Sequence, residues 1–132
     1  MNTKTVLFVE DDEHTRLLYE MVMKRFLPNY TVYVAESAEV ALTILEKTKI
    51  DVIATDVNLA GMSGRCLFIN TKEKHVNNPG FPMPRFIFCS GVERILDNIV
   101  DKIQGYEYLT LTKPFHLEDL AKAIKSFENT LK

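Results

Sequence analysis

Side chains able to do chemistry follow four short apolar runs of this 132-residue chain, each where a run ends. In chain order they are Glu10-Asp11-Asp12, Asp56, Ser90 and Lys113. Carboxylates gathered in one pocket repel, by roughly 4 kcal/mol for two unit charges about 4 Å apart at an effective dielectric near 20. Mg2+ relieves such repulsion, because this hard cation prefers carboxylate, carbonyl and water oxygens. With an amine and a hydroxyl beside the acids, such a pocket would also bind a phosphoryl group.

The hydrophobic pattern indicates which elements would bring these residues together. Short apolar runs predict strands over residues 5–9, 30–35, 51–55, 85–89 and 106–112. Segments of helical period predict helices over 13–26, 37–47, 65–73, 93–104 and 117–131. Repeated strand-then-helix units predict an α/β fold, in which helices cover both faces of a parallel sheet. The carboxyl ends of the strands, with their polar residues, would then share one edge of the sheet.

The core is expected to draw on strands and helices alike. Phe8, Phe86 and Phe88 should be buried strand residues, and Met21 a buried helix residue. The helix over 13–26 carries an apolar stripe that should face inward, formed by Leu17, Leu18, Met21, Val22 and Phe26. The segment 77–84 is rich in Pro, Gly and Asn, which predicts irregular structure, within an unusually long loop expected over 75–84.

Composition limits the class of protein. The length suits a single domain over residues 1–132, with 46% hydrophobic and 26% charged residues. A net charge of -2 argues against direct nucleic-acid binding. No apolar run approaches the roughly 20 residues that a membrane span requires, and no signal peptide precedes the first strand, so a cytoplasmic protein is expected. Cys66 and Cys89 form no CxxC pair and are expected to be reduced thiols.

Four segments, taken together, resemble the response-regulator receiver domains of two-component signalling. They are Val-Leu-Phe-Val-Glu-Asp-Asp-Glu at 6–13, Asp-Val-Ile-Ala-Thr-Asp-Val-Asn-Leu-Ala-Gly-Met-Ser-Gly at 51–64, Phe-Ile-Phe-Cys-Ser-Gly at 86–91 and Leu-Thr-Lys-Pro-Phe at 111–115. The resemblance covers almost the whole chain with the family's order and spacing. It implies a flavodoxin-like (βα)5 three-layer sandwich with a five-stranded parallel sheet in the order 2-1-3-4-5.

The resemblance also implies a role for each site residue. Asp56 would be the nucleophile that becomes an aspartyl phosphate. Asp11 would be the main Mg2+ carboxylate, Glu10 would act partly through water, and Asn58 would offer its backbone carbonyl to the metal. Ser90 would hydrogen-bond the phosphoryl group. Lys113 would pair with a phosphoryl oxygen.

Two neighbouring positions complete this assignment. The bond between Lys113 and Pro114 is expected to be cis, as in the family. Asp12 falls outside the family's metal-binding pair and is interpreted as an acid at the start of a helix.

The implied function is that of a phosphoacceptor in a phosphorelay, with Mg2+ as cofactor. A histidine kinase or histidine phosphotransfer protein would donate the phosphoryl group, and the receiver would catalyse at most its own phosphorylation and dephosphorylation. The output would pass to a downstream protein or to an output domain missing from this chain, which is either a stand-alone receiver or a piece of a longer protein.

Two other functions compete with this interpretation. A receiver-like interaction scaffold would have the fold without phosphotransfer. A phosphatase of the haloacid-dehalogenase type would also use an Asp nucleophile at a strand end, but it needs a second Asp where this chain has Asn58.

The chain departs from the family pattern at two positions. Ala60 replaces a usual proline in the loop after Asp56. Thr110 stands where receivers carry a switch aromatic, and Tyr108 lies two residues earlier on the same side of the strand. Either Tyr108 substitutes for that aromatic or the output face works differently.

Overall fold

The computed structural model describes residues 4–91 and 103–129. A five-stranded parallel sheet has the order β2-β1-β3-β4-β5. The strands are β1 Thr5–Val9, β2 Thr31–Ala35, β3 Val52–Asp56, β4 Arg85–Ser90 and β5 Tyr108–Thr112. The helices are α1 Glu13–Phe26, α2 Ala38–Lys47, α3 Gly64–Asn77 and α5 Leu117–Ser126, the last followed by a 3-10 turn, η2, at Phe127–Asn129. The predicted fold class and strand order are confirmed.

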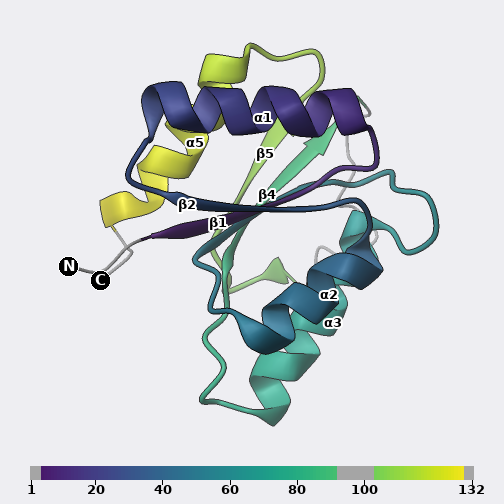
Figure 1. Cartoon of the computed structure of the whole chain (residues 1–132). Coiled ribbons are helices and arrows are strands. Elements are labelled where there is room, and N and C mark those ends of the chain that lie inside the picture. Colours follow the sequence, from purple (N-terminus) through teal and green to yellow (C-terminus); the bar gives the residue numbers. More distant parts are fainter. Residues whose placement is uncertain (1–3, 92–102, 130–132) are drawn as a thin grey trace.

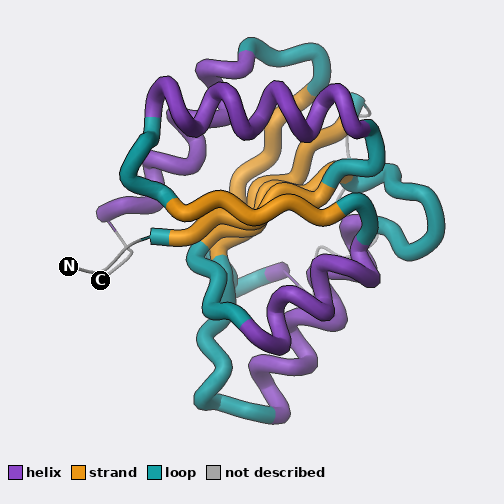
Figure 2. Tube along the Cα trace, in the orientation of Figure 1, coloured by secondary structure: helices purple, strands orange, loops and turns teal. Residues whose placement is uncertain are grey.

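Helices lie on both sides of the sheet, as Figure 1 shows: α1 and α5 cover one face, and α2 and α3 cover the other. Figure 2 shows the strands as a twisted central layer between these helices. All strand pairs are parallel, so the carboxyl ends of β1, β3, β4 and β5 point to the same edge. The residues that follow those strands are therefore brought together by topology alone.

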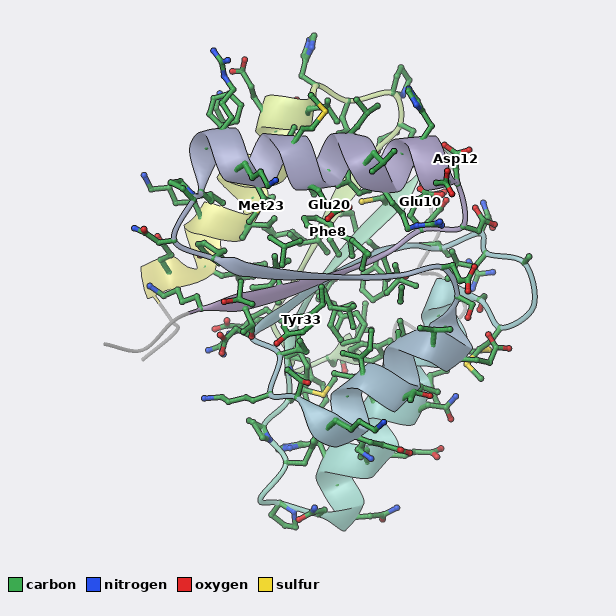
Figure 3. All side chains as sticks on the ribbon, in the orientation of Figure 1. Phe8, Glu10, Asp12, Glu20, Met23 and Tyr33 are labelled. Carbon is green, nitrogen blue, oxygen red and sulfur yellow. The ribbon has the colours of Figure 1, made fainter. Side chains whose placement is uncertain are left out.

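Alternation along the strands divides the core into two layers. Val6 and Phe8 face α1 and α5, whereas Leu7 and Val9 face α2 and α3. Figure 3 shows Phe8 and Met23 between β1 and α1, with Tyr33 on the opposite side of the sheet. The second layer is rich in rings, since Phe68 meets both Phe86 and Phe88 at centroid distances of 5.0 and 5.9 Å.

Side-chain caps begin three of the helices. The Asp12 carboxylate accepts from the backbone N–H of Thr15 at 2.8 Å, as expected of a helix-start acid. The hydroxyls of Ser37 and Ser63 accept from the backbones of α2 and α3, each at 3.1 Å. Such caps each stabilise a helix by about 1 kcal/mol, because they satisfy a backbone donor that has no partner inside the helix.

The predicted inward stripe of α1 is largely wrong. Val22 is buried as expected, but its buried companions are Tyr19 and Met23. Leu17 is 53% exposed, Met21 is 65% exposed, and Phe26 at the end of the helix is 41% exposed, while Leu18 is half-buried. Apolar residues lie on two sides of this helix, so periodicity alone did not distinguish the side that packs on the sheet.

Several element ends differ from the prediction. Helix α3 continues through Asn77, and Asn78 donates its backbone N–H to the Lys74 carbonyl at 3.0 Å, so the loop before β4 covers 78–84 and not 75–84. The irregular stretch predicted over 77–84 differs from it by one residue. His75 ties this segment to the helix through a 2.6 Å contact between its Nδ1 and the Phe81 carbonyl. Strand β5 begins at Tyr108, and α5 ends at Ser126.

The helix predicted over 93–104 lies almost entirely outside the described residues. Among the helices that are described, none combines the length and apolar character needed to cross a membrane. Cys66 and Cys89 are both free thiols, as expected.

Candidate functional site

Three acidic side chains converge at the carboxyl edge of the sheet. Val9 pairs with Thr55 across β1 and β3, so the next residues along the two strands, Glu10 and Asp56, lie side by side. Carboxylate oxygens of Glu10, Asp11 and Asp56 all lie within 4.8 Å of one another. Glu10 is buried, Asp56 is half-buried and Asp11 is exposed, so the cluster opens to solvent on one side.

Backbone groups hold each carboxylate in place. The Asp12 N–H donates to Glu10 at 3.1 Å, the Asn58 N–H donates to Asp56 at 3.2 Å, and the Ala60 N–H donates to Asp11 at 3.3 Å. The last bond joins the loop after β3 to the loop after β1. The cluster is therefore constrained by the loops themselves, including the loop in which Ala60 replaces the family's proline.

Lys113 supplies a positive charge to this cluster. Its Nζ lies 3.1 Å from Oδ2 of Asp56 and 3.6 Å from Oε1 of Glu10. Its backbone N–H donates to the Ser90 carbonyl at 2.7 Å, which ties the end of β5 to the end of β4. The bond from Lys113 to Pro114 is cis, as predicted.

Burial and charge act in opposite directions on the Lys113 ammonium. Burial lowers its pKa, but the hydrogen bond to Asp56 and the charges of Asp56 and Glu10 outweigh burial, so the pKa of Lys113 is raised overall. The amine is therefore a cation at neutral pH.

Burial has the largest effect on the pKa of the Glu10 carboxyl. Burial raises the pKa of this carboxyl, and the neighbouring Asp56 charge adds to the rise, although a backbone hydrogen bond and Lys113 oppose it. Three carboxylates face the Lys113 ammonium, and each of the three acids offers a carboxylate oxygen to the cluster. A hard dication such as Mg2+ fits this donor set, because it would neutralise the excess negative charge with the ligands that it prefers.

The remaining predicted residues lie at the same edge. Ser90 is the last residue of β4 and is 3% exposed, one register position beyond the Cys89 that pairs with Asp56. Asn58 lies two residues after Asp56 and touches it through its backbone N–H. All of the predicted site residues, Glu10, Asp11, Asp56, Asn58, Ser90 and Lys113, thus come from four loops or strand ends on one edge of the sheet.

Comparison with known proteins decides the family. The profile of the response regulator receiver domain matches residues 6–125 of this chain. The chain belongs to the response regulator receiver family. A curated relative, Regulatory protein VanR of Enterococcus faecium, is 29% identical over 121 residues. The match covers 92% of this receiver but 48% of VanR, so the chain spans about half the length of that relative.

Solved structures share the receiver fold. The chemotaxis response regulator CheY4 of Vibrio cholerae has a TM-score of 0.75 at 23% identity, covering 95% of this chain and 98% of that chain. The receiver domain of Ssk1 was solved in a co-crystal with the histidine phosphotransfer signaling protein Ypd1, both from Saccharomyces cerevisiae. That comparison has a TM-score of 0.80 at 18% identity and covers 97% of this chain and 90% of the other.

Gly64 is a site residue that sequence reasoning missed. A Cβ on Gly64 would lie 2.5 Å from the Asp56 carbonyl oxygen and 2.9 Å from the Val57 Cα. Its N–H donates to the Val57 carbonyl at 2.9 Å. The start of α3 therefore packs directly on the backbone of the acidic site, and only a glycine leaves room for it.

Arg16 is a second missed residue. Its Nη1 donates to the backbone carbonyl of Glu10 at 2.9 Å and so joins α1 to the loop that carries two of the acids. A charged residue one turn into a helix after an acidic run was the only signal in the sequence.

Tyr108 and Thr110 lie on the same face of β5, as alternation predicted. Thr110 pairs with Phe88, and Tyr108 pairs with Phe86, whereas the site edge is at the Ser90–Thr112 pair. Four residues separate Tyr108 from Thr112, which is about 13 Å along a strand. Tyr108 is 39% exposed and its ring lies 6.2 Å from that of Phe88. Tyr108 therefore lies well away from the site edge of β5.

Proposed function

We propose that this receiver is a phosphoacceptor, in which Asp56 takes a phosphoryl group from a phosphohistidine. The observation that carries the proposal is the convergence of three carboxylates within 4.8 Å, with the Lys113 amine 3.1 Å from Asp56, in a chain of the receiver family. A histidine kinase or a histidine phosphotransfer protein is the proposed donor. Residues 1–132 would act as one receiver domain.

The proposed cofactor is Mg2+. Carboxylates of Glu10, Asp11 and Asp56, with the backbone carbonyl of Asn58, would hold it, and the close approach of the three carboxylates supports this choice. A bound Mg2+ ion would neutralise negative charge on the phosphoryl group during its transfer.

The chain's own residues account for the transfer. An oxygen of the Asp56 carboxylate attacks phosphorus, the P–N bond to the donor imidazole breaks in line, and the imidazole leaves with the bonding electrons and is protonated. The Lys113 ammonium, already beside Asp56, pairs with a phosphoryl oxygen, and the Ser90 hydroxyl hydrogen-bonds another. The side chain of Asp56 is 12% exposed, which leaves the carboxylate open to a donor.

The exposed face of α1 supports a protein donor. Leu17 and Met21 lie one turn apart on this face, and α1 begins two residues after Asp11. Apolar side chains exposed beside a reactive site mark a surface suited to a partner. The solved complex of the Ssk1 receiver with a phosphotransfer protein is consistent with a partner of this class. Output would pass to a downstream protein or to a domain outside this sequence.

Intact mass after incubation with acetyl phosphate and Mg2+ tests the proposal. The wild-type chain should gain one phosphoryl group, and Asp56→Asn should gain none. Asp12→Asn is the matched control, because it removes a neighbouring acid while keeping a helix-capping side chain, and it should still be modified. A wild type that stays unmodified by phosphodonors would favour the interaction scaffold instead.

A further inference from the structure

The hydrogen bond from Ala60 to Asp11 differs from the other two bonds that hold the acids of the site. Glu10 and Asp56 each accept from a backbone N–H two residues further along the chain, so those bonds are local. Ala60 and Asp11 are 49 residues apart, and the N–H of Ala60 donates to Oδ2 of Asp11 at 3.3 Å. This bond therefore exists only where the fold brings the loop after β3 against the loop after β1.

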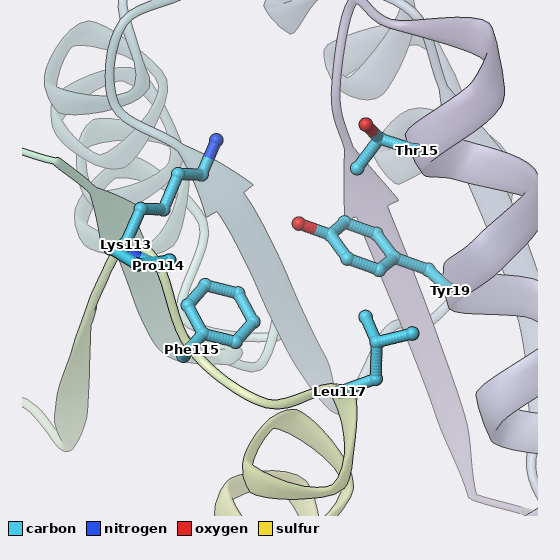
Figure 4. A pocket seen from close by; sticks show the side chains of 6 residues that line it. All are labelled: Thr15, Tyr19, Lys113, Pro114, Phe115 and Leu117. Carbon is cyan, nitrogen blue, oxygen red and sulfur yellow. The ribbon is translucent and has the colours of Figure 1, made fainter.

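Asp11 depends on such a bond more than the other two acids do. Glu10 is buried and Asp56 is half-buried, and both pair with the Lys113 ammonium, at 3.6 and 3.1 Å. Figure 4 shows the Lys113 side chain with its amine directed away from the ring of Phe115. Asp11 is exposed and forms no ion pair with any residue that the structure describes. Repulsion from the neighbouring carboxylates favours turning its side chain toward solvent, and a hydrogen-bond donor opposes that turn.

The backbone of the loop, and not the Ala60 side chain, presents this donor. Ala60 is exposed, so its methyl group contributes little to packing. Gly61 follows with a φ of 79°, where a side chain is strained, and a Cβ on it would lie 3.3 Å from Oε2 of Glu39. The loop ends at the bond from the Gly64 N–H to the Val57 carbonyl, at 2.9 Å.

The donor is available because residue 60 is not proline. The receiver pattern usually has proline at this position, and proline has no backbone N–H. A proline would therefore remove the bond to Asp11, whereas alanine supplies it. The replacement adds one hydrogen-bond donor beside a proposed metal ligand.

A hydrogen bond of this kind suits a metal ligand. A carboxylate has two oxygens that each accept more than one bond, so the bond from Ala60 leaves Asp11 able to bind a cation. Groups that hydrogen-bond a metal ligand from outside fix its orientation, and their removal typically costs roughly 10- to 100-fold in metal affinity. A carboxylate that is already held beside its fellow ligands also loses less freedom when the ion binds.

We propose that Ala60 is a positioning residue of the Mg2+ site. Its backbone N–H holds the Asp11 carboxylate beside Glu10 and Asp56, and this raises the affinity of the site for Mg2+. The inference rests on the proposed function, because it takes Mg2+ as the ion that the three acids bind. It gives a role to a residue outside the proposed set of ligands.

Titration of the full chain with MgCl2, followed by NMR without a phosphodonor, tests the proposal. Ala60→Pro removes the N–H and should raise the dissociation constant for Mg2+ about tenfold, the lower end of the usual range because the bond is long and exposed. Ala60→Ser keeps the N–H and is the matched control, which should bind Mg2+ like the wild type. A dissociation constant for Ala60→Pro equal to or below that of the wild type would overturn the role of Ala60.

Asp11→Ala tests the bond from the side of the acceptor and leaves the loop after β3 unchanged. Without Mg2+, the amide proton resonance of Ala60 should move upfield in this variant, because the proton loses a carboxylate acceptor. The amide of Gly80, which donates to the Asn78 side chain in the loop before β4, should not move. An unchanged Ala60 resonance would refute the contact, even if Ala60→Pro failed to fold.

Phosphorylation by acetyl phosphate separates this inference from the proposed function. Ala60→Pro should need about tenfold more Mg2+ for its half-maximal rate and should reach the wild-type rate at saturating Mg2+, since the nucleophile is unaltered. A lower saturating rate with an unchanged Mg2+ requirement would contradict a positioning role. A wild type that binds no Mg2+ would refute the proposed cofactor and the role of Ala60 together. A Mg2+ affinity that depends on Ala60 in a chain that is never phosphorylated would count against the phosphoacceptor function alone.

Discussion

At the scale of single residues, the acidic site is organised by one amine. Lys113 lies within 3.6 Å of both Glu10 and Asp56, and its backbone is bonded to Ser90. Its ammonium offsets part of the repulsion among the carboxylates and is already placed beside the proposed nucleophile. A substitution of the Lys113 side chain therefore removes the ammonium but keeps the backbone bond to Ser90, so it separates the chemical role of this residue from its structural role.

Replacing Lys113 with methionine, which retains an apolar stem of similar length, should reduce the rate of phosphorylation by acetyl phosphate about 10- to 100-fold. That range corresponds to the loss of one hydrogen bond to a charged group. The rate is measured by intact mass at saturating Mg2+. Lys122→Met, on the outer face of α5, should react like the wild type. A Lys113→Met rate close to the wild-type rate would show that the amine does not assist the transfer.

Gly64 acts through packing and not through charge. Gly64→Ala places a methyl group 2.5 Å from the Asp56 carbonyl oxygen, so the backbone of β3 or α3 must move. We expect a loss of unfolding free energy of about 1–3 kcal/mol and slower phosphorylation. Urea denaturation measures the first effect. Gly80→Ala, whose Cβ would meet nothing closer than 3.4 Å, should lose much less stability. Similar losses in the two variants would contradict the close approach.

At the scale of elements, α1 has two different apolar faces. One face carries Tyr19, Val22 and Met23 into the layer beneath the helix, and the other exposes Leu17 and Met21. The buried face fixes the helix on the sheet. The exposed face lies beside the acidic loop and is available to the proposed phosphodonor.

Two methionines on α1 form a matched pair for testing this division. Met23 is 1% exposed, and Met23→Ala should lower the free energy of unfolding by about 2–5 kcal/mol because it leaves a cavity. Met21 is 65% exposed, and Met21→Ala should change it by no more than about 0.5 kcal/mol. Urea denaturation of the two variants would measure both changes in the free energy of unfolding. Equal losses would mean that the helix is rotated from the orientation described.

At the scale of the whole molecule, the parallel sheet gathers charge at one edge. Glu10, Asp11 and Asp56 approach one another only in the folded chain, so a cation that binds all three favours the native state. The two core layers on either side of the sheet must supply the stability that opposes this repulsion.

Mg2+ should therefore raise the melting temperature of the chain. At a free concentration 100 times its dissociation constant, a ligand that binds only the native state stabilises it by about 2.7 kcal/mol. Thermal unfolding with MgCl2 should show the shift, while NaCl of equal ionic strength should not. Asp11→Asn should diminish the shift. A melting temperature that is insensitive to Mg2+ in the wild type would argue against the metal site.

The sequence by itself determined the features that depend on local pattern and order along the chain. Strand β1 and helix α1 have the predicted ends, because an apolar run and a capped periodic segment are local signals. Polar residues directly after buried strands predicted which side chains would meet at the edge of the sheet. The reason is that the carboxyl ends of parallel strands all lie at that one edge. Asp11, Asp56 and Lys113 were found in this way.

Only the tertiary structure decided which surfaces meet. The choice between the two apolar sides of α1 depended on its fit against Phe8 and α5, which periodicity does not encode. The same holds for Gly64 against Asp56, because a close approach of this kind depends on residues distant in sequence. Spacing along the chain determines which side chains are able to face inward, and packing determines which of them do so.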